Sequence, residues 1–397
     1  MFESTLDSRL RQIVDERSAR QWLRELDARS SKQSVMLTIG GVTYRNFSSN
    51  DYLSLATHPR VQEAATKAIK ACGVGSGASP LLSGRTDYHE ALEDRLARFL
   101  GRPAALTFSS GYGANIGVVS GLVRREAAVF CDRLMHASLI DAVRLTRART
   151  RVYPHGDTNR LQNLLARCQA AERWIVTDGV FSMDGDIAPL PQLAKIARAQ
   201  QAYLIVDDAH GIGVIGEAGK GSLEYTGVDG EDIPVLLGTF GKAFGSAGAF
   251  VAGSKTLVQA LVQVARSYVY STALAPPLAA AALASLNLIE NDPSLRARLR
   301  AKIALFRQQA AEAGLPLLDS VTPIQPILIG DDLAALAVAQ ELRAQGFYLR
   351  AIRPPTVPPG TSRLRICINV AHNAEHIEAL VTALRSALRK HTRVSHE

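Results

Sequence analysis

Three short motifs carry side chains that could do chemistry together, and each lies at the end of an apolar run that is typical of a β-strand. They are residues 179–186 (GVFSMDGD), 205–211 (IVDDAHG) and 238–245 (GTFGKAFG). Lys242, in the third motif, has glycine, alanine and phenylalanine as neighbours and no carboxylate within three positions. A poorly solvated lysine loses its proton more readily, as a lysine that forms Schiff bases must. An ordinary surface lysine in a glycine-rich loop is the alternative.

Asp207 ends an apolar strand, and His210 follows it closely. A carboxylate at this place could hold a ring nitrogen protonated, which makes a pyridine cofactor an electron sink. The histidine could bond a phenolic oxygen of the same ring. A helix N-cap or a satisfied buried carboxylate is the alternative for the aspartate. Because further ligands are missing nearby, we expect no metal at this place.

A phosphate site is indicated by residues 109–115 (SSGYGAN), which follow a strand and lead into a helix. Backbone N–H groups at a helix N-terminus bind anions readily. Ser182, Thr239 and Ser246 offer hydroxyl groups for the same phosphate. His136, beside another helix start, could stack on a flat cofactor, although a single histidine is more often structural.

Two nucleotide-binding motifs are present only in part. Residues 211–216 (GIGVIG) match G-x-G-x-x-G, but a glycine-interrupted segment follows, and Glu231 does not end a strand as the ribose-binding acid should. A Walker A loop around Lys242 fails because Leu236 and Ala243 stand where glycine and serine or threonine are needed.

The elements that position these motifs form an alternation of strands and helices. Short apolar strands are predicted at 104–108, 127–131, 174–178, 203–207, 235–238 and 248–252. This alternation predicts an α/β architecture with a mainly parallel central sheet, whose ligands gather at the carboxyl ends of the strands. Thr86 and Gly101 mark the two ends of a further helix.

Three segments are expected along the chain. Residues 1–47 form an N-terminal helix over 1–30 and a hairpin over 35–47 that turns at Gly40-Gly41. Residues 48–285 form a large α/β domain. Residues 286–397 form a smaller α+β domain with strands at 324–329 and 363–369 and a closing helix at 373–389.

Composition limits the class of protein. The 397 residues are 47% hydrophobic, which excludes a disordered chain. They include 45 Lys and Arg residues against 37 Asp and Glu residues. The net charge of +8 favours anionic ligands. Nucleic acid is not expected, since the richest basic stretch, 144–151, has the composition of a solvated helix face. Four cysteines without C-x-x-C spacing and no long apolar stretch predict a cytoplasmic protein with no disulfide framework and no membrane span.

Taken together, the motifs resemble those of the α-oxoamine synthases, which are pyridoxal-phosphate (PLP) enzymes of fold type I, the aspartate-aminotransferase fold. The resemblance runs from about residue 6 to 388. Its other carriers are 47–53 (FSSNDYL), 132–141 (DRLMHASLID), 267–272 (SYVYST) and 352–366 (IRPPTVPPGTSRLRI).

The resemblance implies a role for each matching residue. Lys242 would hold PLP in a Schiff base, Asp207 would pair with the ring nitrogen, and His210 with the ring hydroxyl. His136 would stack on the ring. The remaining cofactor contacts would come from Gly111, Tyr112, Ser182, Thr239 and Thr272. The substrates would be bound by Arg24, Asn50, His136, Thr356 and Arg365.

The implied activity is that of an acyltransferase in biotin biosynthesis. L-alanine would condense with a pimeloyl thioester, carried on coenzyme A or an acyl carrier protein, with loss of carbon dioxide. The alternatives within the family are glycine with acetyl-CoA, glycine with succinyl-CoA, and serine with a long acyl-CoA. Family members are homodimers with active sites at the interface.

Two positions depart from the family pattern and bear on the thioester contacts, namely Pro80 and Met135. A nucleotide-binding or regulatory protein on an inactive PLP fold is the rival class of function. The joint presence of Lys242, Asp207 and His210 argues against it.

Overall fold

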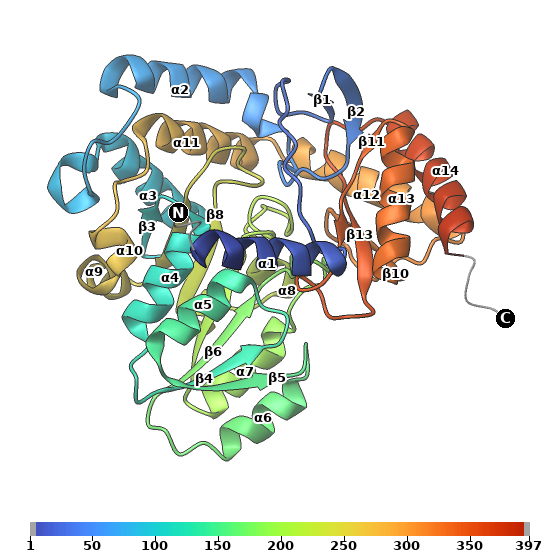
Figure 1. Ribbon diagram of the computed structural model, residues 1–397. Helices are drawn as coiled ribbons and strands as arrows, with labels where there is room; N and C mark the ends of the chain where they lie inside the picture. Colours follow the sequence, from blue (N-terminus) through green and yellow to red (C-terminus); the bar gives the residue numbers. More distant parts are fainter. Residues whose placement is uncertain (1–4, 393–397) are drawn as a thin grey trace. The chain divides into compact units, whose positions relative to one another are not determined.

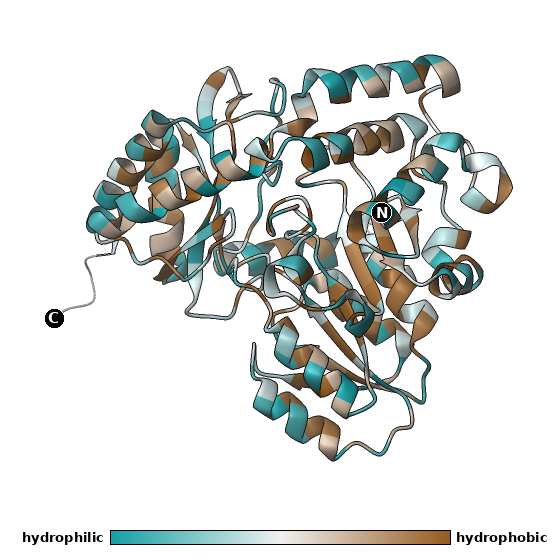
Figure 2. Cartoon of the chain, turned by 180° about the vertical axis from the view of Figure 1, so that it is seen from behind, coloured by the Kyte–Doolittle hydropathy of each residue, from teal (hydrophilic) through white to brown (hydrophobic). Residues whose placement is uncertain are grey.

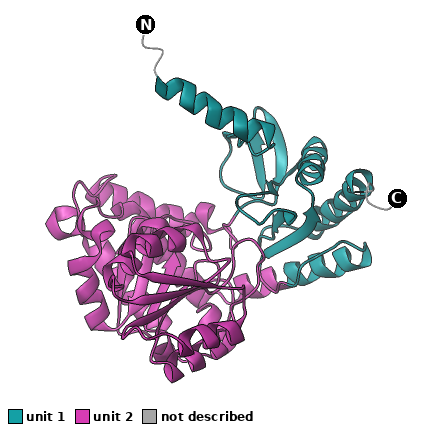
Figure 3. Ribbon diagram, turned by 60° about the horizontal axis from the view of Figure 1, so that its bottom comes forward, with its two compact units in different colours: residues 1–49, 301–319, 323–397 teal, residues 50–300, 320–322 magenta. Residues whose placement is uncertain are grey.

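A computed structural model describes residues 5–392, which form two compact units (Figure 3). The larger unit holds residues 50–300 and 320–322, and the smaller unit holds 1–49, 301–319 and 323–397. The sequence places domain boundaries at 47 and 285, and the second of these positions lies inside helix α11 (Pro276–Asn291).

A seven-stranded sheet forms the centre of the larger unit (Figure 1). Its strands, in spatial order, are β3 (Ala104–Phe108), β9 (Ala249–Gly253), β8 (Val235–Thr239), β7 (Tyr203–Asp207), β6 (Arg173–Asp178), β4 (Ala128–Asp132) and β5 (Arg149–Tyr153). Strand β9 is antiparallel to both neighbours, and every other pair is parallel. The predicted α/β class with a mainly parallel sheet is therefore confirmed.

Helices connect the strands and cover the sheet. They are α2 (Pro59–Cys72), α3 (Asp87–Leu100), α4 (Gly111–Leu122), α5 (Ala137–Thr146), α6 (Thr158–Ala166), α7 (Leu190–Ala199), α8 (Ser222–Thr226), α9 (Lys255–Val264), α10 (Arg266–Val269) and α11, with short turns η1 (Leu55–Thr57), η2 (Pro80–Gly84) and η3 (Gly230–Asp232). The predicted ends of α3 are confirmed. Thr86 and His89 form a capping box, and Gly101 ends the helix in the left-handed conformation.

The core lies on both faces of this sheet, because successive strand side chains point to opposite sides. On one face Val129, Val176 and Ile205 pack with Val118 of α4 and Leu139 of α5. The alternate strand residues are buried as well, so the strands read as continuous apolar runs. Figure 2 shows them in brown between helices of mixed hydropathy. Burial on both faces leaves the strand ends as the place for polar side chains.

One strand of the sheet was missed. Residues 144–151 were expected to be a solvated helix face, but α5 ends at Thr146 and edge strand β5 begins at Arg149. Four of its five residues are exposed, and Arg149 and Arg151 are among them. An exposed edge strand does not need an apolar pattern, and charges on such an edge discourage pairing with other chains.

The smaller unit carries two three-stranded sheets and its own helices. The elements are α1 (Thr5–Ala19), β1 (Met36–Ile39), β2 (Val42–Asn46), β10 (Ile324–Gly330), α13 (Asp332–Ala344), β11 (Phe347–Tyr348), β12 (Ala351–Ile352), β13 (Ser362–Cys367) and α14 (Ala374–His391). Helix α12 (Ser294–Glu312) runs from the larger unit into the smaller one. The hairpin with Gly40 and Gly41 at its turn is confirmed, and both glycines have positive φ angles.

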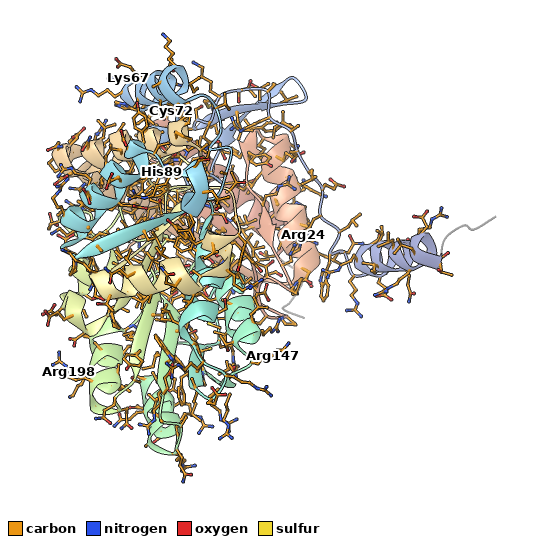
Figure 4. All side chains as sticks on the ribbon, turned by 90° about the vertical axis from the view of Figure 1, so that its left-hand side faces the viewer. Arg24, Lys67, Cys72, His89, Arg147 and Arg198 are labelled. Carbon is orange, nitrogen blue, oxygen red and sulfur yellow. The ribbon has the colours of Figure 1, made fainter. Side chains whose placement is uncertain are left out.

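The N-terminal helix is shorter than predicted. It ends at Ala19 rather than near residue 30, and residues 1–4 lie outside the described residues. Consequently Arg24, which the predicted helix over 1–30 includes, lies in the irregular segment that follows α1 (Figure 4).

Among residues 5–392, no helix combines the length and the apolar composition needed to cross a membrane. Within the same residues, no group of three or more His, Cys, Asp or Glu side chains is arranged to hold a metal ion.

Candidate active site

A cavity of about 180 Å³ opens in the larger unit where strands β7 and β8 end and helix α4 begins. Its lining residues are Gly111, Tyr112, Ala114, Asn115, His136, Ser138, Asp178, Asp207, Ala209, His210, Leu237, Gly238, Thr239 and Lys242. The carboxyl ends of parallel strands are the usual binding place in such sheets. The cavity therefore collects residues of the second and third motifs, and Asp178, which directly precedes the first motif, whereas no residue of 179–186 lines it.

Asp207 is held at the end of β7 by donors on both carboxylate oxygens. Asn115 Nδ2 donates to its Oδ2 at 2.6 Å, and the Ala209 backbone N–H donates to its Oδ1 at 3.0 Å. The side chain is buried. A buried carboxylate with two donors is fixed in direction, so it suits a single positively charged partner in the cavity.

His136 begins helix α5 as its N-cap. Its backbone N–H donates to Asp178 Oδ2 at 2.8 Å, and its Nδ1 lies 2.7 Å from Ser138 Oγ. Burial lowers the pKa of His136 below its ordinary value. Asp207 opposes that shift, and Lys242 adds to it. Burial therefore favours the neutral form of the imidazole at the wall of the cavity.

Asp178 ends β6 beside Asp207 and is fully enclosed. Burial raises the pKa of Asp178 well above its ordinary value, and the neighbouring Asp207 carboxylate raises it further. The bond from the His136 backbone lowers the pKa, but it does not outweigh burial. Burial and the neighbouring carboxylate thus both disfavour the charged form of Asp178.

His210 is positioned by buried Tyr52. Its Nδ1 lies 2.7 Å from the Tyr52 hydroxyl, which also donates to Asn50 Oδ1 at 3.2 Å. Asn50 therefore does not line the cavity and is connected through Tyr52 to His210, which does. The acidic neighbour Asp208 is fully buried and accepts from the Ser222 backbone at 2.7 Å, and burial raises its pKa to about 7.

Lys242 lies in a tight loop between β8 and β9. Thr239 Oγ1 donates to Gly248 O at 2.8 Å and accepts from the Gly241 N–H at 3.2 Å. The Gly245 N–H donates to the Lys242 carbonyl at 2.9 Å. These bonds fix the lysine backbone and place Thr239 and Lys242 on the same cavity wall.

The N-terminus of α4 forms the other end of the cavity. Ser110 caps this helix by accepting from the Gly113 N–H at 3.0 Å, so the neighbouring residues Gly111 and Tyr112 lie at the cavity with the first helical turn. A helix start of this kind suits a phosphate. The Tyr112 hydroxyl itself is engaged by Asp141.

The remaining predicted site residues lie elsewhere. Ser182 does not line the cavity, and Thr272 lines a separate small space together with Pro80. In the smaller unit Arg24 Nη2 donates to Thr356 Oγ1 at 3.1 Å, and Arg365 is buried on β13, where its Nη1 donates to Cys367 Sγ at 3.0 Å. Met135 packs in the apolar core of the larger unit rather than in the cavity.

Several polar residues at the cavity were not singled out from the sequence. They are Asn115, Ser138, Asp178 and, behind His210, Tyr52. Asn115 and Ser138 fall inside the motifs at 109–115 and 132–141, and Asp178 ends an apolar strand as Asp207 does. The position of Asp178 at a strand end could have identified it from the sequence.

The donor set of the cavity fits PLP. The primary amine suits the aldehyde of PLP, and the fixed carboxylate suits its ring nitrogen. The flat imidazole suits the ring face, and the helix N-terminus suits the phosphate. The Asn115 Oδ1 atom is buried and has no hydrogen-bond partner among the described residues, which suits a polar occupant of the cavity.

Comparisons with known proteins give consistent results. The family model described as aminotransferase class I and II matches residues 43–384. The 8-amino-7-oxononanoate synthase of Cellvibrio japonicus is 49% identical over 381 residues, 96% of each chain. That of Methylococcus capsulatus is 50% identical over 375 residues, 94% of this chain and 96% of that relative. A serine palmitoyltransferase from S. paucimobilis, solved with bound PLP, has a TM-score of 0.92 at 27% identity and covers 98% of this chain and 99% of its own.

Proposed function

The chain belongs to the aminotransferase class I and II family, and on this premise we propose that it is an 8-amino-7-oxononanoate synthase, a PLP-dependent acyltransferase. One observation carries the proposal. Lys242, Asp207, His136 and His210 line one cavity in a chain that is about half identical to synthases of that name over nearly its whole length.

PLP, when bound, supplies a pyridine ring that accepts the electrons released at the amino-acid Cα. Lys242 would hold it, and the Asp207 carboxylate would keep the proton on the ring nitrogen. His210 would face the ring hydroxyl, and His136 the ring face. Gly111, Tyr112 and Thr239 would surround the phosphate, with Ser182 and Thr272 as further proposed contacts.

The overall reaction joins the Cα of L-alanine to the carbonyl carbon of a pimeloyl thioester and releases the thiol and carbon dioxide. The Lys242 amine is the base at the cavity wall that can take the proton from Cα. Arg365, with Asn50, is proposed to bind the alanine carboxylate. Arg24 and Thr356, which are already hydrogen-bonded to each other, are proposed to bind the acyl chain.

A second candidate keeps the chemistry and changes the substrates. The close structural likeness to a serine palmitoyltransferase favours serine with a long acyl-CoA. Its identity of 27% is well below the 49% and 50% of the oxononanoate synthases, so we place it second. Glycine with acetyl-CoA or succinyl-CoA stands behind both.

Two further proposals concern the molecule in the cell. We expect a homodimer whose active sites lie at the interface, and a cytoplasmic location. Sedimentation of the PLP-loaded protein tests the first, since a mass near 42.7 kDa instead of twice that value would contradict it.

The function is tested by a substrate panel. Purified PLP-loaded protein is offered L-alanine, glycine or L-serine with pimeloyl, acetyl, succinyl or palmitoyl thioesters, and the products are identified by mass. The highest kcat/KM is expected for alanine with pimeloyl-CoA or pimeloyl carrier protein. A preference for serine with palmitoyl-CoA would replace the assignment with the second candidate.

A further inference from the structure

We propose that Asn115 is a positioning residue that acts through Ser138 to fix His136 as a neutral imidazole with its proton on Nε2. The three side chains, together with Asp207, form a chain of hydrogen bonds along one wall of the cavity. The inference rests on the proposed function, because it concerns the ring that would face the cofactor.

Asp207 determines which atoms donate and which accept in this series of hydrogen bonds. A carboxylate only accepts, so the atom of Asn115 that lies 2.6 Å from Asp207 Oδ2 must be the amide nitrogen. The second hydrogen of that nitrogen points to Ser138 Oγ at 2.8 Å. Both amide hydrogens are therefore used, and the alternative orientation of the Asn115 amide is excluded.

Ser138 continues this series of hydrogen bonds to His136. Its hydroxyl oxygen accepts from Asn115, and its single hydrogen remains for His136 Nδ1 at 2.7 Å. The Ser138 backbone N–H also donates to Nδ1, at 3.3 Å, in the N-cap of α5. A ring nitrogen that accepts two hydrogen bonds carries no proton, so the proton of neutral His136 is on Nε2.

Other titratable groups face the same cavity. They are Asp207, Lys242, Asp178, His210 and the Tyr112 hydroxyl. Asp207 favours a charged imidazole and Lys242 disfavours it, while burial disfavours it most. The hydrogen-bond chain adds a geometric obstacle, because a proton on Nδ1 would meet the Ser138 hydroxyl and backbone N–H.

The consequence is a separation of charge in the site. With PLP bound, Asp207 would be left to hold a single positive charge on the cofactor ring, and the imidazole beside the ring would stay neutral. A charged His136 would repel that ring. Asn115 thus acts on both groups. Its amide nitrogen donates to Asp207, and it also donates to the Ser138 hydroxyl, which leaves the hydroxyl hydrogen for His136.

The test is the protonation of His136 in PLP-loaded protein labelled with ¹⁵N-histidine. Nuclear magnetic resonance distinguishes the Nε2–H form from the Nδ1–H form and from the cation, and the His136→Gln variant identifies the signal. The titration is followed from pH 4 to 9, and wild type should show the Nε2–H form without titration above pH 6. In Ser138→Ala and in Asn115→Ala the proton affinity of His136 should rise about threefold to tenfold, as expected for losing one ordered hydrogen bond.

Ser285→Ala is the matched control, because Ser285 is equally buried in α11 and lies outside the cavity lining. It should leave the His136 signal unchanged. An Nδ1–H form in wild type, or the same titration in wild type and Ser138→Ala, would overturn the inference. Failure of the wild type to bind PLP would instead overturn the proposed function, and the histidine spectrum of that protein would still decide the tautomer.

Discussion

At the scale of single residues, the electrostatics of the cavity depend on which of two adjacent carboxyl groups is charged. Asp178 and Asp207 end neighbouring strands in register. Burial raises the pKa of Asp178, whereas Asp207 receives two hydrogen bonds that favour its carboxylate. The two groups are therefore driven apart in charge, as acid and base groups of active sites commonly are.

This assignment predicts the effect of Asp207→Asn. The amide keeps the size of the side chain but cannot hold a proton on a ring nitrogen, so turnover should fall by about 10²–10⁴. Steady-state kinetics with saturating PLP measures the loss, and thermal unfolding checks that the fold is kept. Near-normal turnover in a folded variant would show that Asp207 is only structural.

The charge of His155 stabilises a contact between Asp132, at the end of β4, and Asp186. Its Nδ1 lies 2.9 Å from Asp132 and its Nε2 lies 2.8 Å from Asp186. Burial alone would lower the pKa of His155, but the two carboxylates outweigh it and raise the pKa to about 10. The stabilisation is thus complete below the ordinary pKa of about 6.5 and is lost as the pH rises through about 10.

His155→Gln should therefore destabilise the protein by about 1–3 kcal/mol at pH 6, because charged hydrogen bonds are lost. The difference from wild type should narrow as the pH approaches 10. Urea unfolding at pH 6, 8 and 10 measures it. A difference that stays constant over this range would contradict a charged His155.

At the scale of elements, the loop that carries Lys242 depends on a close approach to the turn η1. Gly245 has a φ of 60°, and a Cβ there would lie 2.1 Å from the Ala56 backbone nitrogen. Gly227 has a φ of 70° but nothing within 4 Å of its Cβ position. Both glycines have a left-handed backbone that strains other residues, but only Gly245 lacks space for a Cβ atom.

Gly245→Ala should consequently cost clearly more than Gly227→Ala, for which about 1 kcal/mol is expected from the left-handed backbone alone. It should also weaken PLP binding, since the lysine loop must shift away from η1. Urea unfolding and PLP titration of both variants test this. Equal behaviour of the two variants would show that the loop can move without consequence.

Elements with a buried apolar pattern were predictable, and exposed ones were not. The six strands predicted for the central sheet all exist, with ends shifted by at most about one residue, because burial on both faces makes them uniformly apolar. Edge strand β5 carries arginines instead, and α1 ends at Ala19 although helical spacing continues beyond it. For β5, solvent exposure removes the apolar pattern on which periodicity depends, whereas for α1 the spacing predicted a helix longer than the one that forms.

At the scale of the whole molecule, the strand ends identified the cavity because parallel strands bring their carboxyl ends together. The sequence could not identify Asn115 as the partner of Asp207, since residues distant in sequence meet only in the folded sheet. The same holds for Arg24 and Thr356, which are far apart in the chain and hydrogen-bonded in the smaller unit.

The contact between Arg24 and Thr356 leads to a prediction about substrate choice. If Arg24 binds the terminal carboxylate of the pimeloyl chain, Arg24→Ala should raise the KM for the pimeloyl thioester by about tenfold or more. The KM for alanine should hardly change. Arg9→Ala, which removes an exposed arginine of α1, is the matched control. Equal kinetics of the two variants would place Arg24 among the solvated surface arginines.

The central claim is that Lys242 carries PLP, and reductive labelling tests it most directly. The purified protein should be yellow, and sodium borohydride should bleach the visible band and attach the cofactor permanently to one peptide. Mass spectrometry of a digest is expected to find the label on Lys242. Label on another lysine, or a folded wild-type protein that binds no PLP, would contradict the account.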